Sequence, residues 1–212
     1  MKFRREEATF TQRMLVLAIV LLSPQWMFAE SPREVLERYC KMDANGKQLE
    51  VGGWLQLARM FIVQRELSPG PIVVFRHKLE VIRGFLIGDP VMEGDDKAKL
   101  AVRYSYFGEI DYDSLIFSPS KEPSVEEVRT YNLLLTTKHY DLGSQSEEVL
   151  RSGAKAWRIE GSPSEPHLKI DAALFCVQQL RDKATGAITK ENANVTIKAL
   201  SRLRLSLPRD PR

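Results

Sequence analysis

The sequence contains few of the residues that usually carry out chemistry, since its 212 residues include only two cysteines and three histidines. None of the histidines, His77, His139 and His167, stands at metal-ligand spacing from another histidine or a carboxylate on one helix. A glycine-rich phosphate loop, a Gly-x-Ser-x-Gly turn and a stretch of interleaved basic and aromatic residues are also missing. These absences argue against a zinc site, a nucleotide-binding loop, a serine hydrolase and an RNA-binding surface. We therefore expect no metal and no cofactor.

Long hydrophobic runs are also scarce. The unbroken run Met14–Leu22 has nine residues, whereas a helix that spans a membrane needs roughly 20. The basic residues that precede it are Lys2, Arg4, Arg5 and Arg13. This combination is typical of an export signal. Ala29 is the small residue placed for cleavage, so we expect a signal peptide over residues 1–29 and a periplasmic or secreted protein. Because the large Met27 lies close to the cut, an uncleaved membrane anchor is the alternative.

Neither sign of charge is in large excess. The formal net charge is +3, and removal of residues 1–29, which hold four basic and two acidic side chains, leaves about +1. The basic character therefore belongs partly to the signal and gives no support for nucleic-acid binding. The end of the chain differs, because Lys190–Arg212 has six basic side chains against two acidic ones. We expect a basic tail or a short helix over residues 186–212, either solvated or in contact with membrane phosphates.

Helix signals open the mature chain. Ser31 and Glu34 have the spacing of a capping box, with Pro32 at the first helical position. These residues predict a helix that begins at Ser31 and ends at Asn45. A second apolar stripe predicts a short helix over Gly53–Ile62.

The hydrophobic period then changes to two, which predicts a sheet. The expected strands cover residues 79–87, 100–107, 127–140 and 156–160, in antiparallel order. A further helix is expected over Lys169–Lys183, where apolar residues recur at helical spacing. The predicted fold class is α+β: N-terminal helices packed in a curved, cone-like antiparallel sheet of about four strands, with an extra C-terminal helix. Residues 30–185 are expected to form this single domain.

The last predicted strand has the pattern Ala156-Trp157-Arg158-Ile159-Glu160-Gly161. Together with the order of the elements, this pattern resembles the nuclear transport factor 2-like superfamily of cystatin-like cones, over roughly Ser31–Gly161. The resemblance implies a curved sheet folded around a helix, with an open mouth that takes a small apolar molecule. Many bacterial members of that superfamily are exported. The chain departs from the family pattern in its extra helix after Gly161 and in lacking an evident Asp–His pair that matches the enzymatic members.

Five side chains are candidates for the lining of such a cone: Arg83, Tyr104, Tyr106, Tyr131 and His139. Phenolic hydroxyls orient ligands in apolar pockets, but tyrosines in strands are also ordinary core residues. If Arg83 points inward it needs an anionic partner, and if the register shifts by one residue it faces water. If His139 faces the cone it is a candidate base with Asp111 or Asp141. We expect His167, just before the last helix, to lie in a loop.

Cys40 and Cys176 both lie on apolar helix faces in the exported part of the chain. An oxidising compartment permits a disulfide between them. The alternative is two separate buried thiols that act as small hydrophobic residues. A nucleophilic role is not favoured, because an apolar helix face does not lower the pKa of a thiol.

Three functions remain open from the sequence. The first is a non-enzymatic exported domain that binds a small apolar ligand or a partner protein of the cell envelope. The second is an acid–base enzyme of isomerase or dehydratase type, with His139, an aspartate and a tyrosine in the cone. The third is a structural or interaction protein whose cone is filled by its own side chains. A homodimer through the sheet and membrane contact through the signal or the basic tail are further candidate interactions, and nucleic acid is not expected.

Overall fold

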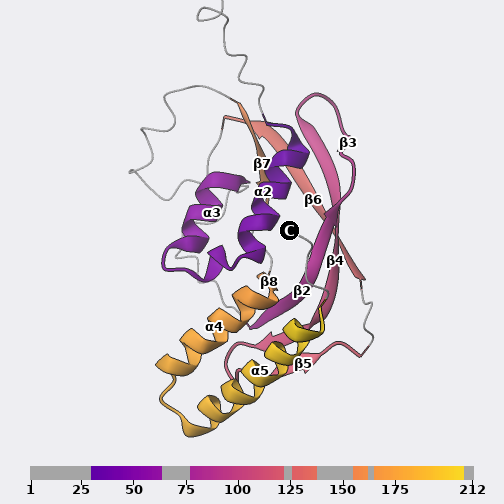
Figure 1. The fold of residues 1–212 in the computed structure, drawn as a ribbon. Helices are drawn as coiled ribbons and strands as arrows, with labels where there is room; N and C mark the ends of the chain where they lie inside the picture. The colour runs from indigo at the N-terminus through magenta and orange to yellow at the C-terminus, as the bar shows by residue number, and fades with distance from the viewer. Residues whose placement is uncertain (1–29, 64–76, 122–125, 138–154, 162–164, 208–212) are drawn as a thin grey trace, which may run out of the picture.

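The computed structural model describes residues 30–63, 77–121, 126–137, 155–161 and 165–207. Over these ranges the protein has an α+β fold, in which four α-helices pack against a curled, mixed β-sheet (Figure 1). The expected signal segment, residues 1–29, lies outside the described residues. Among the helices of these ranges, none has the length and apolar character needed to cross a membrane.

The helices are α2 (Pro32–Ala44), the 3-10 helix η1 (Lys47–Leu49), α3 (Gly53–Phe61), α4 (Ile170–Lys183) and α5 (Ala187–Ser206). The strands are β1 (Ile62–Val63), β2 (Lys78–Ile87), β3 (Val91–Met92), β4 (Lys97–Asp111), β5 (Phe117–Pro119), β6 (Glu126–Thr136), β7 (Ala156–Glu160) and β8 (His167–Lys169). The strand order is β1-β7-β6-β4-β2-β8, and β3 and β5 also pair with β4.

Helix α2 begins where the capping box predicts. The backbone N–H of Ser31 donates to Glu34 Oε2 over 2.7 Å, and the backbone N–H of Glu34 donates to Ser31 Oγ over 3.3 Å. The buried face of α2 consists of Pro32, Val35, Leu36, Tyr39, Cys40, Asp43 and Ala44. This otherwise apolar face therefore brings one carboxylate, that of Asp43, into the interior.

The four predicted strands correspond to β2, β4, β6 and β7, which are successive antiparallel neighbours. The complete sheet is mixed, however, because β1 pairs in parallel with β7 and β8 pairs in parallel with β2. Strand β8 replaces the loop that the sequence predicts around His167. It forms because its backbone continues the sheet beside β2 while His167 and Leu168 are buried.

Strand β2 changes its facing direction partway along. Its pairing with β4 shifts between Val81 and Ile82 and again one step later. As a result, Leu79 and Val81 belong to one part of the core, whereas Phe85, which strand alternation would place on the same face, packs against the other part. Arg83 falls at this irregularity and is exposed, with its guanidinium carbon 5.1 Å from the centroid of the Phe107 ring. Of the two placements open for Arg83, the structure shows the solvent-facing one, so Arg83 does not line a concave face.

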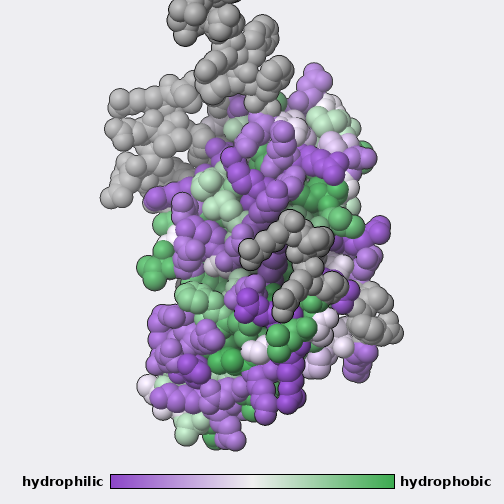
Figure 2. Space-filling model, in the orientation of Figure 1, coloured by the Kyte–Doolittle hydropathy of each residue, from purple (hydrophilic) through white to green (hydrophobic). Residues whose placement is uncertain are grey.

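The core has two parts. The first lies between the sheet and helices α2 and α3, and its largest fully buried side chains include those of Tyr39, Phe61 and Tyr104. The second lies where α4 and α5 pack against each other and against the ends of β2 and β4 (Figure 1). Helix α5 extends over 20 residues, which is longer than the tail or short helix expected there. On the face seen in Figure 2, mostly hydrophilic residues cover the surface over α4 and α5, with hydrophobic ones showing between them.

The two cysteines are buried and are not joined in a disulfide. Cys40 belongs to the first part of the core and Cys176 to the second. The structure thus shows the arrangement of two separate thiols rather than a bridge. Burial raises the pKa of the Cys40 thiol to about 12, even though its contact with the Tyr104 hydroxyl, at 3.5 Å, acts in the opposite direction.

Candidate functional site: a polar pocket over a buried charge cluster

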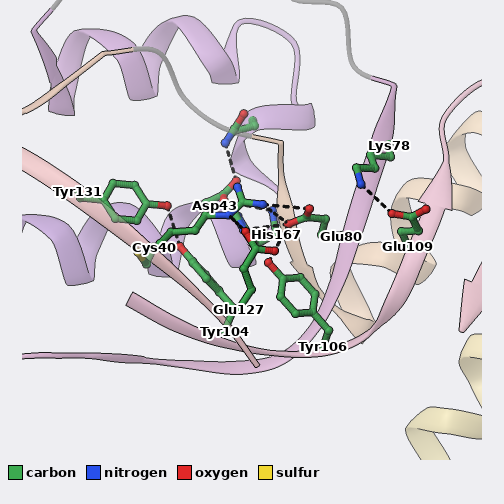
Figure 3. Close-up of polar contacts among 12 residues, drawn as sticks. Cys40, Asp43, Lys78, Glu80, Tyr104, Tyr106, Glu109, Glu127, Tyr131 and His167 are labelled. Atoms are coloured by element: carbon green, nitrogen blue, oxygen red, sulfur yellow. Dashed lines mark hydrogen bonds and ion pairs between the residues drawn. The ribbon is translucent and has the colours of Figure 1, made fainter. Parts of the chain in front are cut away.

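Three buried ionisable side chains meet inside the domain (Figure 3). Asp43 comes from the end of α2, Glu80 from β2 and His167 from β8, and they are 1%, 6% and 1% exposed. The parallel register of β2 and β8 pairs Glu80 directly with His167. Because adjacent strand residues point to opposite faces, the Glu80 side chain lies on the side away from Leu79. We call Asp43, Glu80, Arg129 and His167 the charge cluster.

The backbone N–H and both ring nitrogens of His167 have partners in the cluster. Its backbone N–H donates to Asp43 Oδ2 over 3.1 Å, and its ring Nδ1 lies 3.2 Å from the same oxygen. Its Nε2 lies 3.0 Å from Glu80 Oε2, in an ion-pair contact. The other oxygen of Asp43 accepts from Gln48 Nε2 over 2.7 Å. The imidazole, from the C-terminal part of the chain, therefore bridges two carboxylates from its N-terminal part, those of Asp43 and Glu80.

Glu80 is fixed by side chains from three other strands. Arg129 Nη2, from β6, lies 3.0 Å from each of its two oxygens, and the Tyr106 hydroxyl, from β4, donates to Oε2 over 3.0 Å. The contact with His167 of β8 adds the third strand. Arg129 also donates from Nε to Glu127 Oε1 over 2.6 Å. This carboxylate thus has a single, well-defined position.

Burial and pairing act in opposite directions on the pKa values of the cluster. Burial raises the pKa of Asp43, and the hydrogen bonds from His167 and Gln48 only partly offset it. Burial favours neutral His167, but its contacts with Asp43 and Glu80 outweigh that effect and raise its pKa. Burial also opposes ionisation of Glu80, yet His167, Arg129 and Tyr106 together leave its pKa lowered. The Glu80 carboxylate and the His167 imidazolium therefore stabilise each other.

An open pocket of about 290 Å³ lies over Glu80. It is lined by Lys78, Glu80, Tyr106, Gly108, Glu109, Ser118, Pro119, Ser120 and Glu127. On one wall, Lys78 Nζ donates to Glu109 Oε2 over 2.9 Å (Figure 3). Asp43 and His167 do not line the pocket. Glu80 is consequently the member of the charge cluster through which a molecule in the pocket would contact the buried network.

A glycine permits the close approach of β4 and β5 at the pocket wall. Gly108 has a φ of +151°, which side-chain-bearing residues rarely adopt. A Cβ atom at this position would lie 2.2 Å from the backbone oxygen of Ser118 and 2.8 Å from the Cα of Pro119. The shape of this wall therefore depends on the missing side chain.

The three tyrosines among the predicted site residues have different surroundings. Tyr106 lines the pocket. Tyr104 and Tyr131 are only 1% and 9% exposed and belong to the core, where their hydroxyl oxygens lie 2.9 Å apart. Tyr104 also stacks on His167. Tyr104 thus covers His167 on the interior side, and Tyr131 contacts Tyr104 behind it.

The predicted base cannot be placed in this site. His139 and its candidate partner Asp141 lie outside the described residues. The other candidate partner, Asp111, accepts hydrogen bonds from the backbone and the hydroxyl of Ser114 in a turn. These contacts lower the pKa of Asp111.

The four members of the charge cluster were not identified from the sequence. Asp43 carries a detectable signal, because it follows Leu36 by seven residues on the same apolar helix stripe. Glu80 carries another, since it stands inside the apolar segment Leu79–Ile82. His167 carries none, because its main partner Asp43 is 124 residues away in the chain. The Asp–His pair that was not evident in the sequence is formed only by the fold.

The chain matches no family model, no curated protein and no solved structure. Within the described ranges, no group of three or more His, Cys, Asp or Glu side chains is placed to hold a metal ion. The geometry of the pocket and its charge cluster is therefore the basis for a functional assignment.

Proposed function

We propose that the chain is an exported, non-enzymatic domain that binds a small ligand in the pocket over Glu80. The signal pattern of residues 1–29 supports export, and the curled sheet around α2 supports a cone of the nuclear transport factor 2-like kind. One observation carries the binding function. At the floor of an open pocket, a nearly buried carboxylate is held in one position by side chains from three strands.

Binding fits Glu80 better than catalysis does. A general base is most effective when its pKa lies near the working pH, whereas the pKa of Glu80 is lowered. Its Oε2 already receives the hydroxyl of Tyr106 and the guanidinium of Arg129. A carboxylate in this state is suited to orienting a ligand rather than to removing a proton from it.

The lining indicates a polar ligand of small size. Six of the nine lining residues are charged residues or serines, so a polar ligand replaces the apolar one expected for the cone. Ligand pockets for drug-sized molecules occupy roughly 300 to 1,000 Å³. A pocket of about 290 Å³ therefore suits a ligand at or below the lower end of that range.

Native mass spectrometry of the protein purified from its own envelope fraction tests this function. We expect a retained small mass in the wild type and its loss in Ser118→Trp, because the indole fills the pocket. Thr130→Trp is the matched control, since Thr130 is an exposed strand residue that does not line the pocket, and it should retain the mass. A mass that survives Ser118→Trp contradicts binding at this site.

The placement of His167 between Asp43 and Glu80 favours a second candidate function. This candidate is an acid–base enzyme in which the imidazole sets the pKa of Glu80. The two candidates differ in the ionisation of one carboxyl group. The binding function requires Glu80 to titrate below its ordinary value of 4.5, whereas the enzyme requires a value near neutral pH. Carbon-detected NMR titration of the Glu80 carboxyl, with Glu80→Gln for assignment, distinguishes them.

A further inference from the structure

The hydrogen-bonding groups of the pocket indicate the chemical class of its ligand. We propose that the pocket takes a small organic cation that donates N–H hydrogen bonds, an alkylammonium or a guanidinium. This inference rests on the proposed ligand-binding function and names the ligand of that same site.

The charges of the lining are unequal. Three carboxylates, those of Glu80, Glu109 and Glu127, face one ammonium group, that of Lys78. Arg129 lies behind the lining and is bonded to Glu80 and Glu127. Its charge and that of Lys78 offset two of the three carboxylates, and the pair of Asp43 and His167 adds no net charge, so one negative charge remains. A cation in the pocket compensates the remaining negative charge, whereas an anion adds to it.

The cationic side chains at the pocket already donate to its carboxylates, so the groups left for a ligand are mainly hydrogen-bond acceptors. Lys78 donates to Oε2 of Glu109, and Arg129 Nε donates to Oε1 of Glu127. Among the described residues, none donates to the second oxygen of either carboxylate, and we assign these two oxygens to the ligand. The Tyr106 hydroxyl donates its proton to Glu80 and so offers the pocket only lone pairs. A ligand rich in N–H donors complements these groups.

The aromatic group of the pocket favours the same class. Tyr106 is a lining residue whose phenol is fixed by its bond to Glu80. The face of a phenol ring attracts an ammonium or a guanidinium. An alkylammonium or a guanidinium can therefore combine ion pairing, hydrogen bonding and ring contact in a volume of about 290 Å³.

The experiment uses four probes with the same four-carbon chain: n-butylammonium, n-butylguanidinium, n-butanol and butyrate. Backbone amide chemical shifts of residues 30–212 are followed during titration with each probe. We expect both cations to shift the amides of Tyr106, Glu109 and Glu127, with an affinity that falls as salt is added. The neutral and anionic probes should bind at least about fivefold more weakly, which corresponds to one ion pair near the surface.

A pair of adjacent variants tests the charge directly. Glu127→Gln should weaken binding of n-butylammonium by about two- to fivefold. Glu126→Gln is the matched control, because Glu126 pairs with Arg103 and does not line the pocket. It should leave the affinity unchanged, and the amide spectra confirm that both variants are folded.

The outcomes separate this inference from the function on which it rests. If n-butanol or butyrate shifts the same amides with equal or higher affinity, the cation proposal is wrong and ligand binding stands. Equal effects of Glu127→Gln and Glu126→Gln also contradict it. If no probe shifts the pocket amides and the native protein retains no small mass, both proposals fail.

Discussion

The imidazole of His167 lies flat against the phenol ring of Tyr104, with ring centroids 3.9 Å apart and ring planes inclined by 11°. One face of the imidazole is thus covered by an aromatic ring while its two nitrogens contact Asp43 and Glu80. Four elements, α2, β2, β4 and β8, supply these groups. The position of the His167 side chain therefore depends on the packing of all four elements.

Replacing this histidine should strongly destabilise the protein. In His167→Ala, Asp43 and Glu80 stay buried without the imidazole between them, and loss of one partner of a buried ion pair costs about 3 to 5 kcal/mol. Urea unfolding measures the loss in the free energy of unfolding. His77→Ala is the control, because His77 is exposed, and it should change the value by no more than about 0.5 kcal/mol. A similar small change in His167→Ala contradicts the structural role of the cluster.

The contribution of His167 should depend on pH in a defined direction. Since folding raises its pKa above the ordinary value of 6.5, the stabilisation is complete below pH 6.5 and is lost as the pH rises through the raised value. The difference in unfolding free energy between wild type and His167→Gln should therefore narrow with increasing pH. Urea unfolding at a series of pH values from 6 upward measures it. A constant or widening difference overturns the expectation.

The hydroxyl of Thr196 connects helix α5 to the segment that leads into β5, and its loss should destabilise the protein. Thr196 Oγ1 donates to the backbone oxygen of Leu115 over 2.7 Å and accepts from the backbone N–H of Phe117 over 3.0 Å. Thr196→Val keeps the shape but leaves both backbone groups without a partner, so we expect a loss of about 1 to 3 kcal/mol. Thr196→Ser keeps the hydroxyl and should cost less. Equal losses in the two variants, measured by urea unfolding, would show that the hydrogen bonds contribute nothing.

The wall of the pocket should not tolerate a methyl group at Gly108. In Gly108→Ala the new Cβ meets the backbone of β5 at a φ that alanine disfavours, and such strain costs about 1 to 3 kcal/mol. Gly84→Ala is the matched control on the neighbouring strand, because a Cβ there meets nothing within 4 Å. Thermal unfolding of the two variants tests this. Gly108→Ala with the stability of Gly84→Ala would contradict the close contact of β4 and β5.

The cysteines should behave as two free thiols that are protected by burial. Both are buried, and the pKa of Cys40 is raised to about 12, so iodoacetamide should modify the native protein only slowly. In denaturant without reductant, mass spectrometry should show two added carbamidomethyl groups. Modification that requires a reductant would instead demonstrate a disulfide.

Local sequence signals predict much of this fold. The capping box at Ser31 places the start of α2, and the apolar stripe over Lys169–Lys183 predicts α4 almost residue for residue. The alternating segments predict β2, β4, β6 and β7. These signals succeed because they depend on neighbours within a few residues, such as a cap or one face of a helix.

The features that were missed depend on distant partners. A period of two places Arg83 between Val81 and Phe85 on one apolar face, but the shifted pairing of β2 with β4 puts these two residues in different parts of the core, and Arg83 between them is exposed. Strand β8 has only three residues and forms because β2 offers a free edge. The charge cluster likewise combines residues from four elements, and of the predicted site residues that the structure describes, only Tyr106 lines the pocket above it.

The contact between Asp43 and His167 spans 124 residues of chain, and this separation affects the order of folding. Until β8 is in place, Asp43 has no imidazole beside it, and Glu80 has only Arg129 and Tyr106 as partners. We therefore expect α2 to form before it packs fully on the sheet. A contact between such distant residues requires closure of a long loop, whose entropy cost precedes the stabilisation that the contact gives. Strand β8, with three residues, thus makes the packing of the N-terminal helix conditional on near-completion of the chain.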